Sequence, residues 1–252
     1  MNTACGFAYA QARIQSRFAE LPPQEEWRRL AGARTLAGFL EEARTGPLRD
    51  WVKPLSGQSD CHDLEIGLRA VYREHVAEVA GWLPKPWRAA IGWTRWLVLM
   101  PLFDHLARGG TMPAWVVRDP DLQRLLHEDG SLGPEHLRFG DAHILLAQGS
   151  DPAAVWTEIW RQLWPPCKAE FQANMVALEA LLAGHLEVFR RVSPEAAWEL
   201  RHGLRERLRL LFHRRLLQPA GAFSHLALVA LDMEHLRAEL VTRALFPSLE
   251  AA

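Results

Sequence analysis

The sequence has 252 residues, of which 49% are hydrophobic and 23% are charged, an ordinary globular composition for one or two domains. Its 29 lysines and arginines nearly balance its 30 aspartates and glutamates, so the formal net charge is −1. This balance argues against general nucleic-acid binding and against a simple polybasic membrane anchor, because both depend on an excess of cations.

The first half of the chain carries a series of helix patterns. Residues 7–17 form the first, and Thr35 is a possible N-cap for a second, short helix. Asp60 predicts the start of a long helix running toward Gly81. The expected buried stripe of that helix is Leu64, Leu68, Val71, His75 and Val79. A further helix opens at Pro86, and Pro101 should kink or end it.

Prolines in a first-turn position mark the later helices, since the missing N–H is unpaired there anyway. The starts are Asp119-Pro120, Gly133-Pro134, Asp151-Pro152 and Ser193-Pro194. Helices are expected near 120–127, 134–148, 152–164, 167–191, 194–217 and 223–246. The β signals are limited to Trp115-Val116-Val117 and the hairpin-type turn Asp129-Gly130.

The fold class predicted by these patterns is all-α, a compact multi-helix bundle. The segment 109–134 is rich in Gly, Pro and Asp and resembles a connector between two helical lobes. We therefore expect an N-terminal helical lobe at 1–110, a connector at 111–133 and a C-terminal helical lobe at 134–252.

Cysteine usage and hydropathy indicate the compartment. The cysteines Cys5, Cys61 and Cys167 are odd in number and far apart, which favours a reducing cytosol over a disulfide framework or a zinc ribbon. Arg13 and Arg17 interrupt any apolar core of a signal peptide. The longest uncharged run, 216–231, is too short and too polar to span a bilayer.

Eleven tryptophans are the one unusual feature of the composition. Several lie at expected helix ends or beside prolines, as Trp82, Trp87 and Trp164 do. A large amphipathic ring there fills the corner between two helices, so corner packing is the better interpretation than a cofactor site.

Candidate catalytic groups are sparse. Cys61-His62-Asp63 resembles a nucleophile with a base, but neighbouring side chains on a helix diverge by about 100°, and Asp63 more simply supports a helix N-terminus. Asp232 and His235 share a helix face, yet no third or fourth metal ligand is visible, so a hydrogen bond on the helix surface is expected. We predict no cofactor, no metal and no catalytic residue.

The densest charge feature lies at 201–215, within the helix expected at 194–217. Its arginines are expected on a cationic outer face opposite a leucine stripe; they are Arg201, Arg205, Arg207, Arg209, Arg214 and Arg215. Two interpretations stay open: a solvated face, or a docking surface for an acidic partner, because clustered arginines suit carboxylates.

Three segments carry a family resemblance. They are Phe7-Ala8-Tyr9-x-x-Ala12-Arg13-Ile14, the leucine-rich acidic stretch 35–45, and Asp232-Met233-Glu234-His235-Leu236-Arg237. Together they resemble the C (AC39-type) subunit family of V-type, or A-type, ATPases, with a degraded middle counterpart at 93–102.

The resemblance implies helical lobes of that family's type and a non-catalytic coupling subunit at the cytoplasmic face of the cell membrane. Its expected partners are the central shaft and the proteolipid ring, and only these partners would contact the membrane. Tyr9, Arg13 and Arg237 match the family motifs and are read as mainly structural, with Arg13 tying helices together at a lobe junction. The candidate partner-binding residues are Tyr9, Arg13, Arg201, Arg205, Arg209 and Arg237.

Two other hypotheses stay open. A stand-alone helical adaptor related to the family is favoured by the short chain and the altered middle segment. An all-α enzyme would require Asp104, His105, Asp232 and His235 to converge in one pocket.

Overall fold

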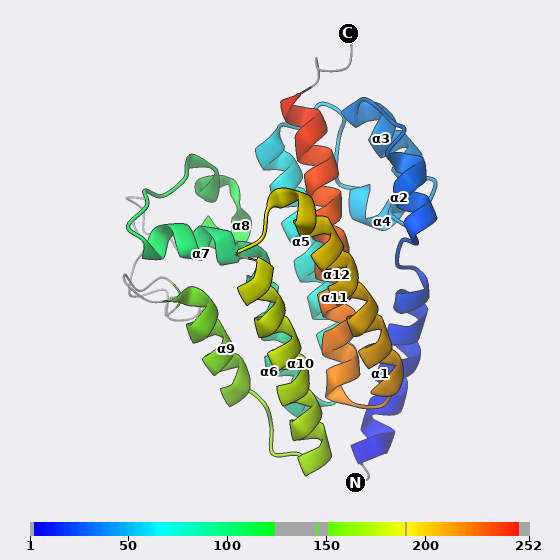
Figure 1. Ribbon diagram of the computed structural model, residues 1–252, viewed down its shortest axis with the longest axis vertical. Coiled ribbons are helices and arrows are strands. Elements are labelled where there is room, and N and C mark those ends of the chain that lie inside the picture. Colours follow the sequence, from blue (N-terminus) through cyan, green and yellow to red (C-terminus); the bar gives the residue numbers. More distant parts are fainter. Residues whose placement is uncertain (1–2, 124–144, 146–150, 190, 247–252) are drawn as a thin grey trace.

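The computed structural model describes residues 3–123, 145, 151–189 and 191–246, and every regular element in these ranges is helical (Figure 1). The predicted all-α class is therefore confirmed for the described part of the chain. None of the helices in these ranges is both long and apolar enough to cross a membrane.

The helices fall into long and short groups. The long ones are α1 (Thr3–Ala19), α5 (Cys61–Trp82), α9 (Pro152–Gln162), α10 (Ala169–Phe189), α11 (Pro194–Arg214) and α12 (Pro219–Leu245). The short ones are α2 (Gln24–Leu30), α3 (Leu36–Ala43), α4 (Arg49–Val52), α6 (Arg88–Trp93), α7 (Met100–Ala107) and α8 (Pro120–Gln123). Three 3₁₀ helices join them: η1 (Lys85–Trp87), η2 (Thr94–Leu99) and η3 (Ala114–Arg118).

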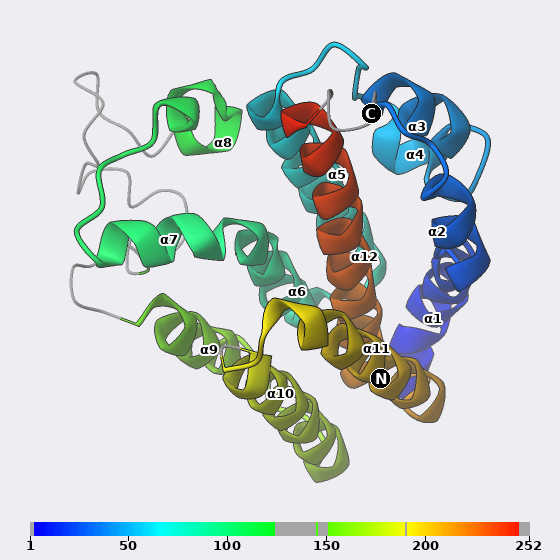
Figure 2. The ribbon, with the colours of Figure 1, turned by 45° about the horizontal axis from the view of Figure 1, so that its top comes forward.

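Helices α5 and α12 lie side by side in the middle of the molecule (Figures 1 and 2). The short helices α2, α3 and α4 form a corner on one side, and α6, α7 and α9 lie on the other (Figure 2). Helix α12 packs against α1, α3, α5, α10 and α11, so it is the central element. The first residues of α1 and the last residues of α12 lie at opposite ends of the long axis (Figure 1).

The inner face of α5 illustrates how the core is built. Its buried residues follow a spacing of three or four, as the 3.6-residue turn requires: Leu64, Leu68, Tyr72, Val76 and Val79, together with Arg69. The predicted stripe is thus right at three positions. Val71 and His75 are only partly buried, because the burial line steps by four residues through Tyr72 and Val76.

Local helix signals are confirmed at several boundaries. The Thr35 hydroxyl accepts a hydrogen bond from the Gly38 N–H, and the Asp60 carboxylate accepts one from the Asp63 N–H. Pro101 lies in the first turn of α7, so a helix boundary does lie at this proline, although the preceding α-helix α6 already ends at Trp93 and η2 fills the space between them.

Other expectations differ from the structure or lie outside it. The β-like run Trp115-Val116-Val117 lies in η3, and α12 begins at Pro219, earlier than the expected 223. Of the helix expected at 120–127, the described part is α8. The structure does not describe the turn at 129–130 or, apart from residue 145, the helix expected at 134–148. Part of the expected connector also lies outside the described residues, so the domain boundaries stay a prediction.

Candidate functional site

The opening motif divides between two faces of α1. Phe7, Ala10 and Ile14 are buried, at a spacing that places them on one side of the helix. Tyr9 and Arg13 lie on the exposed side, and the Tyr9 side chain is 61% exposed. The motif therefore both packs α1 into the core and presents a tyrosine and an arginine to the outside.

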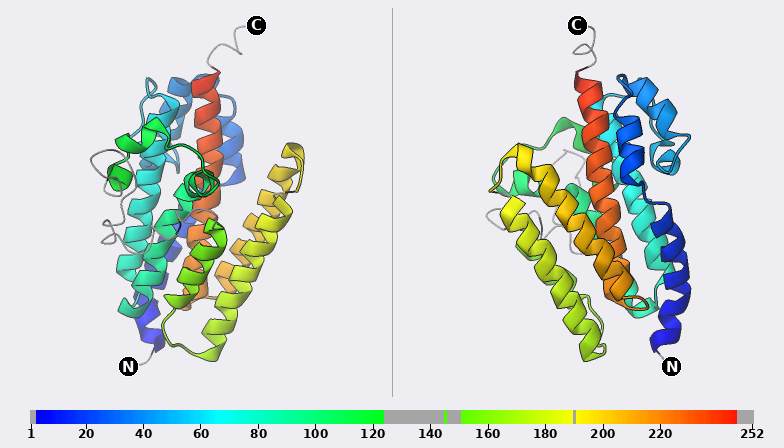
Figure 3. Two further views of the ribbon diagram at one scale, coloured as in Figure 1. Left: turned by 90° about the vertical axis from the view of Figure 1, so that its left-hand side faces the viewer. Right: turned by 45° about the vertical axis from the view of Figure 1, so that its right-hand side comes forward.

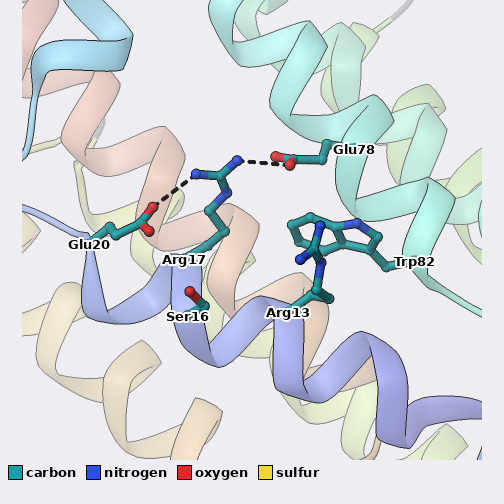
Figure 4. A pocket seen from close by; sticks show the side chains of 6 residues that line it. All are labelled: Arg13, Ser16, Arg17, Glu20, Glu78 and Trp82. Atoms are coloured by element: carbon teal, nitrogen blue, oxygen red, sulfur yellow. Dashed lines mark hydrogen bonds and ion pairs between the residues drawn. The ribbon is translucent and has the colours of Figure 1, made fainter.

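A cleft of about 220 Å³ lies where α1 meets α5 (Figure 4). Its lining residues are Arg13, Ser16, Arg17, Glu20, Glu78 and Trp82. The Arg17 guanidinium lies 2.9 Å from Glu20 and 2.8 Å from Glu78, and these two carboxylates raise the Arg17 pKa above its usual value. The Glu78 contact ties α1 to α5.

Arg13 makes a different contact in the same cleft. Its guanidinium lies over the Trp82 ring, 5.3 Å from the centroid, which is cation–π geometry (Figure 4). No acidic side chain in the described part of the chain forms an ion pair with Arg13. Arg13 thus joins α1 to α5 and keeps its positive charge available.

His75, which is partly buried, and His225, which is fully buried, form a pair next to Glu78 of this cleft. The Nε2 atoms of His75 on α5 and His225 on α12 are 3.0 Å apart, and Glu78 lies 3.8 Å from His75 Nδ1. Burial lowers the His75 pKa to about 4 and the His225 pKa well below its usual value. Both rings are therefore neutral at neutral pH, and one Nε2–H donates to the other.

The nearby carboxylate favours one tautomer of His75. Glu78 lies 3.8 Å from Nδ1 and favours a proton there, and in that tautomer His75 Nε2 accepts from the Nε2–H of His225. His225 Nδ1 is then an acceptor, and it has no hydrogen-bond partner among the described residues. The sequence gives no signal for this pair, because His225 lies in an uncharged run and its partner is 150 residues away.

The arginines of α11 are not all on an outward-facing surface. Arg205 forms an ion pair with the buried Asp232 of α12, and it also donates to the Pro22 carbonyl oxygen at 3.1 Å. The expected outward position is therefore wrong for Arg205, and the expected surface hydrogen bond is wrong for Asp232, which is 2% exposed. Burial raises the Asp232 pKa to about 6 in spite of the arginine.

The other arginines of the 201–215 stretch differ in their contacts and in their exposure. Arg201 lies 3.9 Å from Glu234 and stacks over Trp198, and Arg209 lies over the Phe18 ring at 5.5 Å. Arg207 and Arg214 are exposed, whereas Arg215 is partly buried.

Arg237 belongs to a second network of ion pairs, which begins at the surface and reaches a buried aspartate. It pairs with Glu65 of α5 at 2.5 Å, and Glu65 also lies 3.6 Å from Arg69. Arg69 and Arg73 approach the fully buried Asp119 at 3.8 Å and 3.4 Å. The network runs from α12 across α5 to the segment that follows η3, and the sequence did not predict it.

The four residues of the enzyme hypothesis, Asp104, His105, Asp232 and His235, each contact a different partner. Asp104 pairs with Arg108 at 2.7 Å, and His105 hydrogen-bonds the Thr111 carbonyl oxygen. His235 instead stacks on Trp27 with ring centroids 4.1 Å apart. No group of three His, Cys, Asp or Glu residues in the described ranges is arranged to hold a metal ion.

Comparison with protein-family models, with curated proteins and with solved structures finds no match to this chain. What the protein does must therefore be inferred from its own residues and their geometry. The features that carry such an inference are the two-faced α1, the cleft beside it, and the ion pairs that join the long helices.

Proposed function

We propose that this chain is a non-catalytic coupling subunit of a V-type (A-type) ion-translocating ATPase. It would link the soluble central shaft to the membrane proteolipid ring, as a peripheral protein on the cytoplasmic face of the membrane, with helical lobes of the C (AC39) type. The observation that carries the proposal is the position of the opening motif. Its apolar residues hold α1 in the core, and Tyr9 and Arg13 are left exposed for a partner.

The connections between the long helices support a mechanical role. Ion pairs join α1 to α5 through Arg17 and Glu78, α5 to α12 through Glu65 and Arg237, and α11 to α12 through Arg205 and Asp232. A coupling element that bends would store the transmitted work as strain. Cross-links between long helices limit such bending, because each charged pair fixes the relative position of two elements.

Tyr9 and Arg13 are exposed and are the proposed partner-contacting residues of the opening motif. Tyrosine and arginine are enriched at interface hot spots, because each combines a large contact area with hydrogen bonding. Arg201 and Arg209 would form a second partner-contacting surface, on α11. Arg205 and Arg237 would support assembly indirectly, by holding α11 and α12 in place.

An affinity pull-down of the tagged full-length chain from membranes in mild detergent tests the proposal. We expect shaft and proteolipid subunits to copurify. Tyr9→Ala/Arg13→Ala should reduce their recovery several-fold, because it removes the exposed contact and the Trp82 stacking. The matched control is Arg34→Ala/Lys53→Ala, two exposed cations near the α2–α4 corner.

Recovery of the chain alone, as a monomer or small oligomer without rotary subunits, would contradict the coupling role. That result would favour the stand-alone adaptor. Equal loss of partners in both double variants would contradict the assignment of Tyr9 and Arg13.

A further inference from the structure

One end of the molecule gathers four segments that are far apart in the sequence. They are the first part of α1 (3–13) and the turns 81–88, 163–170 and 213–218, and all lie at the lower end in Figures 1 and 3. We call this surface the basal end.

Side-chain contacts tie these segments together. The Leu217 N–H donates to the Gln11 side-chain oxygen at 2.9 Å, and the Gln218 amide donates to Glu170 at 3.2 Å. The Phe7 ring lies 6.5 Å from Trp87 and 6.1 Å from Phe171. The basal end is therefore one continuous surface over a shared aromatic core.

Positive charge is concentrated on the basal end. Its four segments contain six cationic side chains and one carboxylate, that of Glu170, although the whole chain has a net charge of −1. The cations are Arg13, Lys85, Arg88, Lys168, Arg214 and Arg215. All of them except Arg215 are exposed. The balanced total charge thus hides a strongly basic end.

Apolar side chains are exposed on the same end. Leu216 and Leu217, in the turn between α11 and α12, are 38% and 39% exposed, and Tyr9 projects from α1. Leu217 has a φ of 60°, a left-handed conformation that is unusual for a bulky residue. The hydrogen bond to Gln11 holds this strained turn, which presents two leucines among the cations.

We propose that the basal end binds directly to the surface of an anionic phospholipid membrane. Such a membrane satisfies both features at once, because its headgroup phosphates attract the cations and its acyl region accepts the two leucines. An acidic protein segment would match the cations, but it would offer no apolar layer to accept the exposed leucines. This contact goes beyond the proposed coupling role and replaces the expectation that only partner subunits meet the membrane.

Several weak contributions add up at such a surface. Each cation near an anionic leaflet gives about a fivefold gain in affinity, and the gain falls with ionic strength. Burial of the exposed leucines adds a component that salt does not screen. Binding should therefore be strong at low salt and only partly lost at high salt.

Vesicle cosedimentation of the purified full-length chain tests this proposal. We expect binding to vesicles of phosphatidylcholine with about one-third phosphatidylglycerol, and little binding to phosphatidylcholine alone. Lys85→Glu/Arg214→Glu changes four units of charge on the basal end, so affinity should fall by about a hundredfold or more. The control Arg34→Glu/Lys53→Glu makes the same charge change near the α2–α4 corner and should bind like the wild type.

Leu216→Ser should leave low-salt binding largely intact and weaken the part that persists at high salt, because Leu217 alone remains to enter the acyl region, with an unchanged circular dichroism spectrum. The proposal is overturned if the wild type ignores anionic vesicles, or if the two charge-reversal variants lose binding equally. It is also overturned if the chain binds polyglutamate but not the vesicles, which would identify an acidic protein as the partner. The test uses the isolated chain, so its outcome is independent of whether rotary subunits copurify.

Discussion

At Asp232, a carboxylate lies almost fully buried between two helices and contacts the guanidinium of Arg205. Burial disfavours the charged carboxylate and the arginine favours it; the balance raises the Asp232 pKa to about 6. A pair of this kind contributes little if both partners are replaced together, but the loss of one partner leaves an uncompensated buried group.

This asymmetry gives a prediction for the pair. Arg205→Met should lower the free energy of unfolding by about 3 kcal/mol at neutral pH, because Asp232 then loses its counter-charge and the Pro22 carbonyl loses its donor. Adding Asp232→Asn should restore part of that loss. Urea denaturation followed by circular dichroism measures both. Arg207→Met on the exposed side of α11 is the control and should change stability by less than about 0.5 kcal/mol.

The sequence could not predict this pair for a physical reason. Arg205 and Asp232 are 27 residues apart on two helices, and their contact depends on how α11 and α12 rotate against each other. Side-chain periodicity within one helix does not contain that rotation. The same limit applies to His75 and His225, which meet only because α5 and α12 pack side by side.

At the scale of the elements, boundaries set by local chemistry were predictable. Thr35 and Asp60 cap their helices through their own side chains, and Pro101 acts through its missing N–H. Trp115-Val116-Val117 has the composition of a strand, but no neighbouring strand exists in the described ranges to complete its hydrogen bonds, and the segment forms a 3₁₀ turn.

The tight turn between α11 and α12 gives a prediction at this scale. A Cβ added at Gly221 would lie 2.6 Å from the Arg215 carbonyl oxygen, so Gly221→Ala should destabilise the protein by about 1–3 kcal/mol. Gly203, in the middle of α11, has no other side chain within 4 Å of such a Cβ. Gly203→Ala should instead stabilise by about 0.5–1 kcal/mol, because alanine is the better helix former.

Thermal and urea unfolding of the two alanine variants, each compared with the wild type, measure these opposite effects. A similar loss of stability in both variants would contradict the close approach inferred at Gly221. Since the substitution is chemically identical, the comparison isolates the packing of the turn.

For the whole molecule, the arrangement of charge matters more than its total. The basal end is basic, and ion pairs between helices, one of them largely buried, join the long helices to one another. Helices α5 and α12 form the central pair of this body, and the neutral histidines His75 and His225 lie at their contact. The stability of the fold should therefore depend on the protonation of this histidine pair.

The sign of that dependence follows from the direction in which burial moves the histidine pKa. Burial lowers the His75 pKa from 6.5 to about 4, so its contribution to stability is present above pH 6.5 and is lost as the pH falls toward 4. A pKa that differs by one between the folded and the unfolded chain corresponds to about 1.4 kcal/mol. Asp232 has the opposite effect on stability. Its pKa is raised in the folded chain, so protonation of Asp232 increases the free energy of unfolding as the pH falls from about 6 to about 4.

A variant comparison separates the two effects, since Asp232 titrates in both proteins. His75→Gln/His225→Leu removes the histidine pair, so its stability should depend less on pH than that of the wild type. Between about pH 7 and pH 5, the stability advantage of the wild type should shrink by at least about 2 kcal/mol in urea denaturation. His202→Gln, at an exposed histidine of α11, should follow the wild type at both values. An advantage that stays constant between the two pH values would mean that the buried pair does not set the acid sensitivity of the α5–α12 contact.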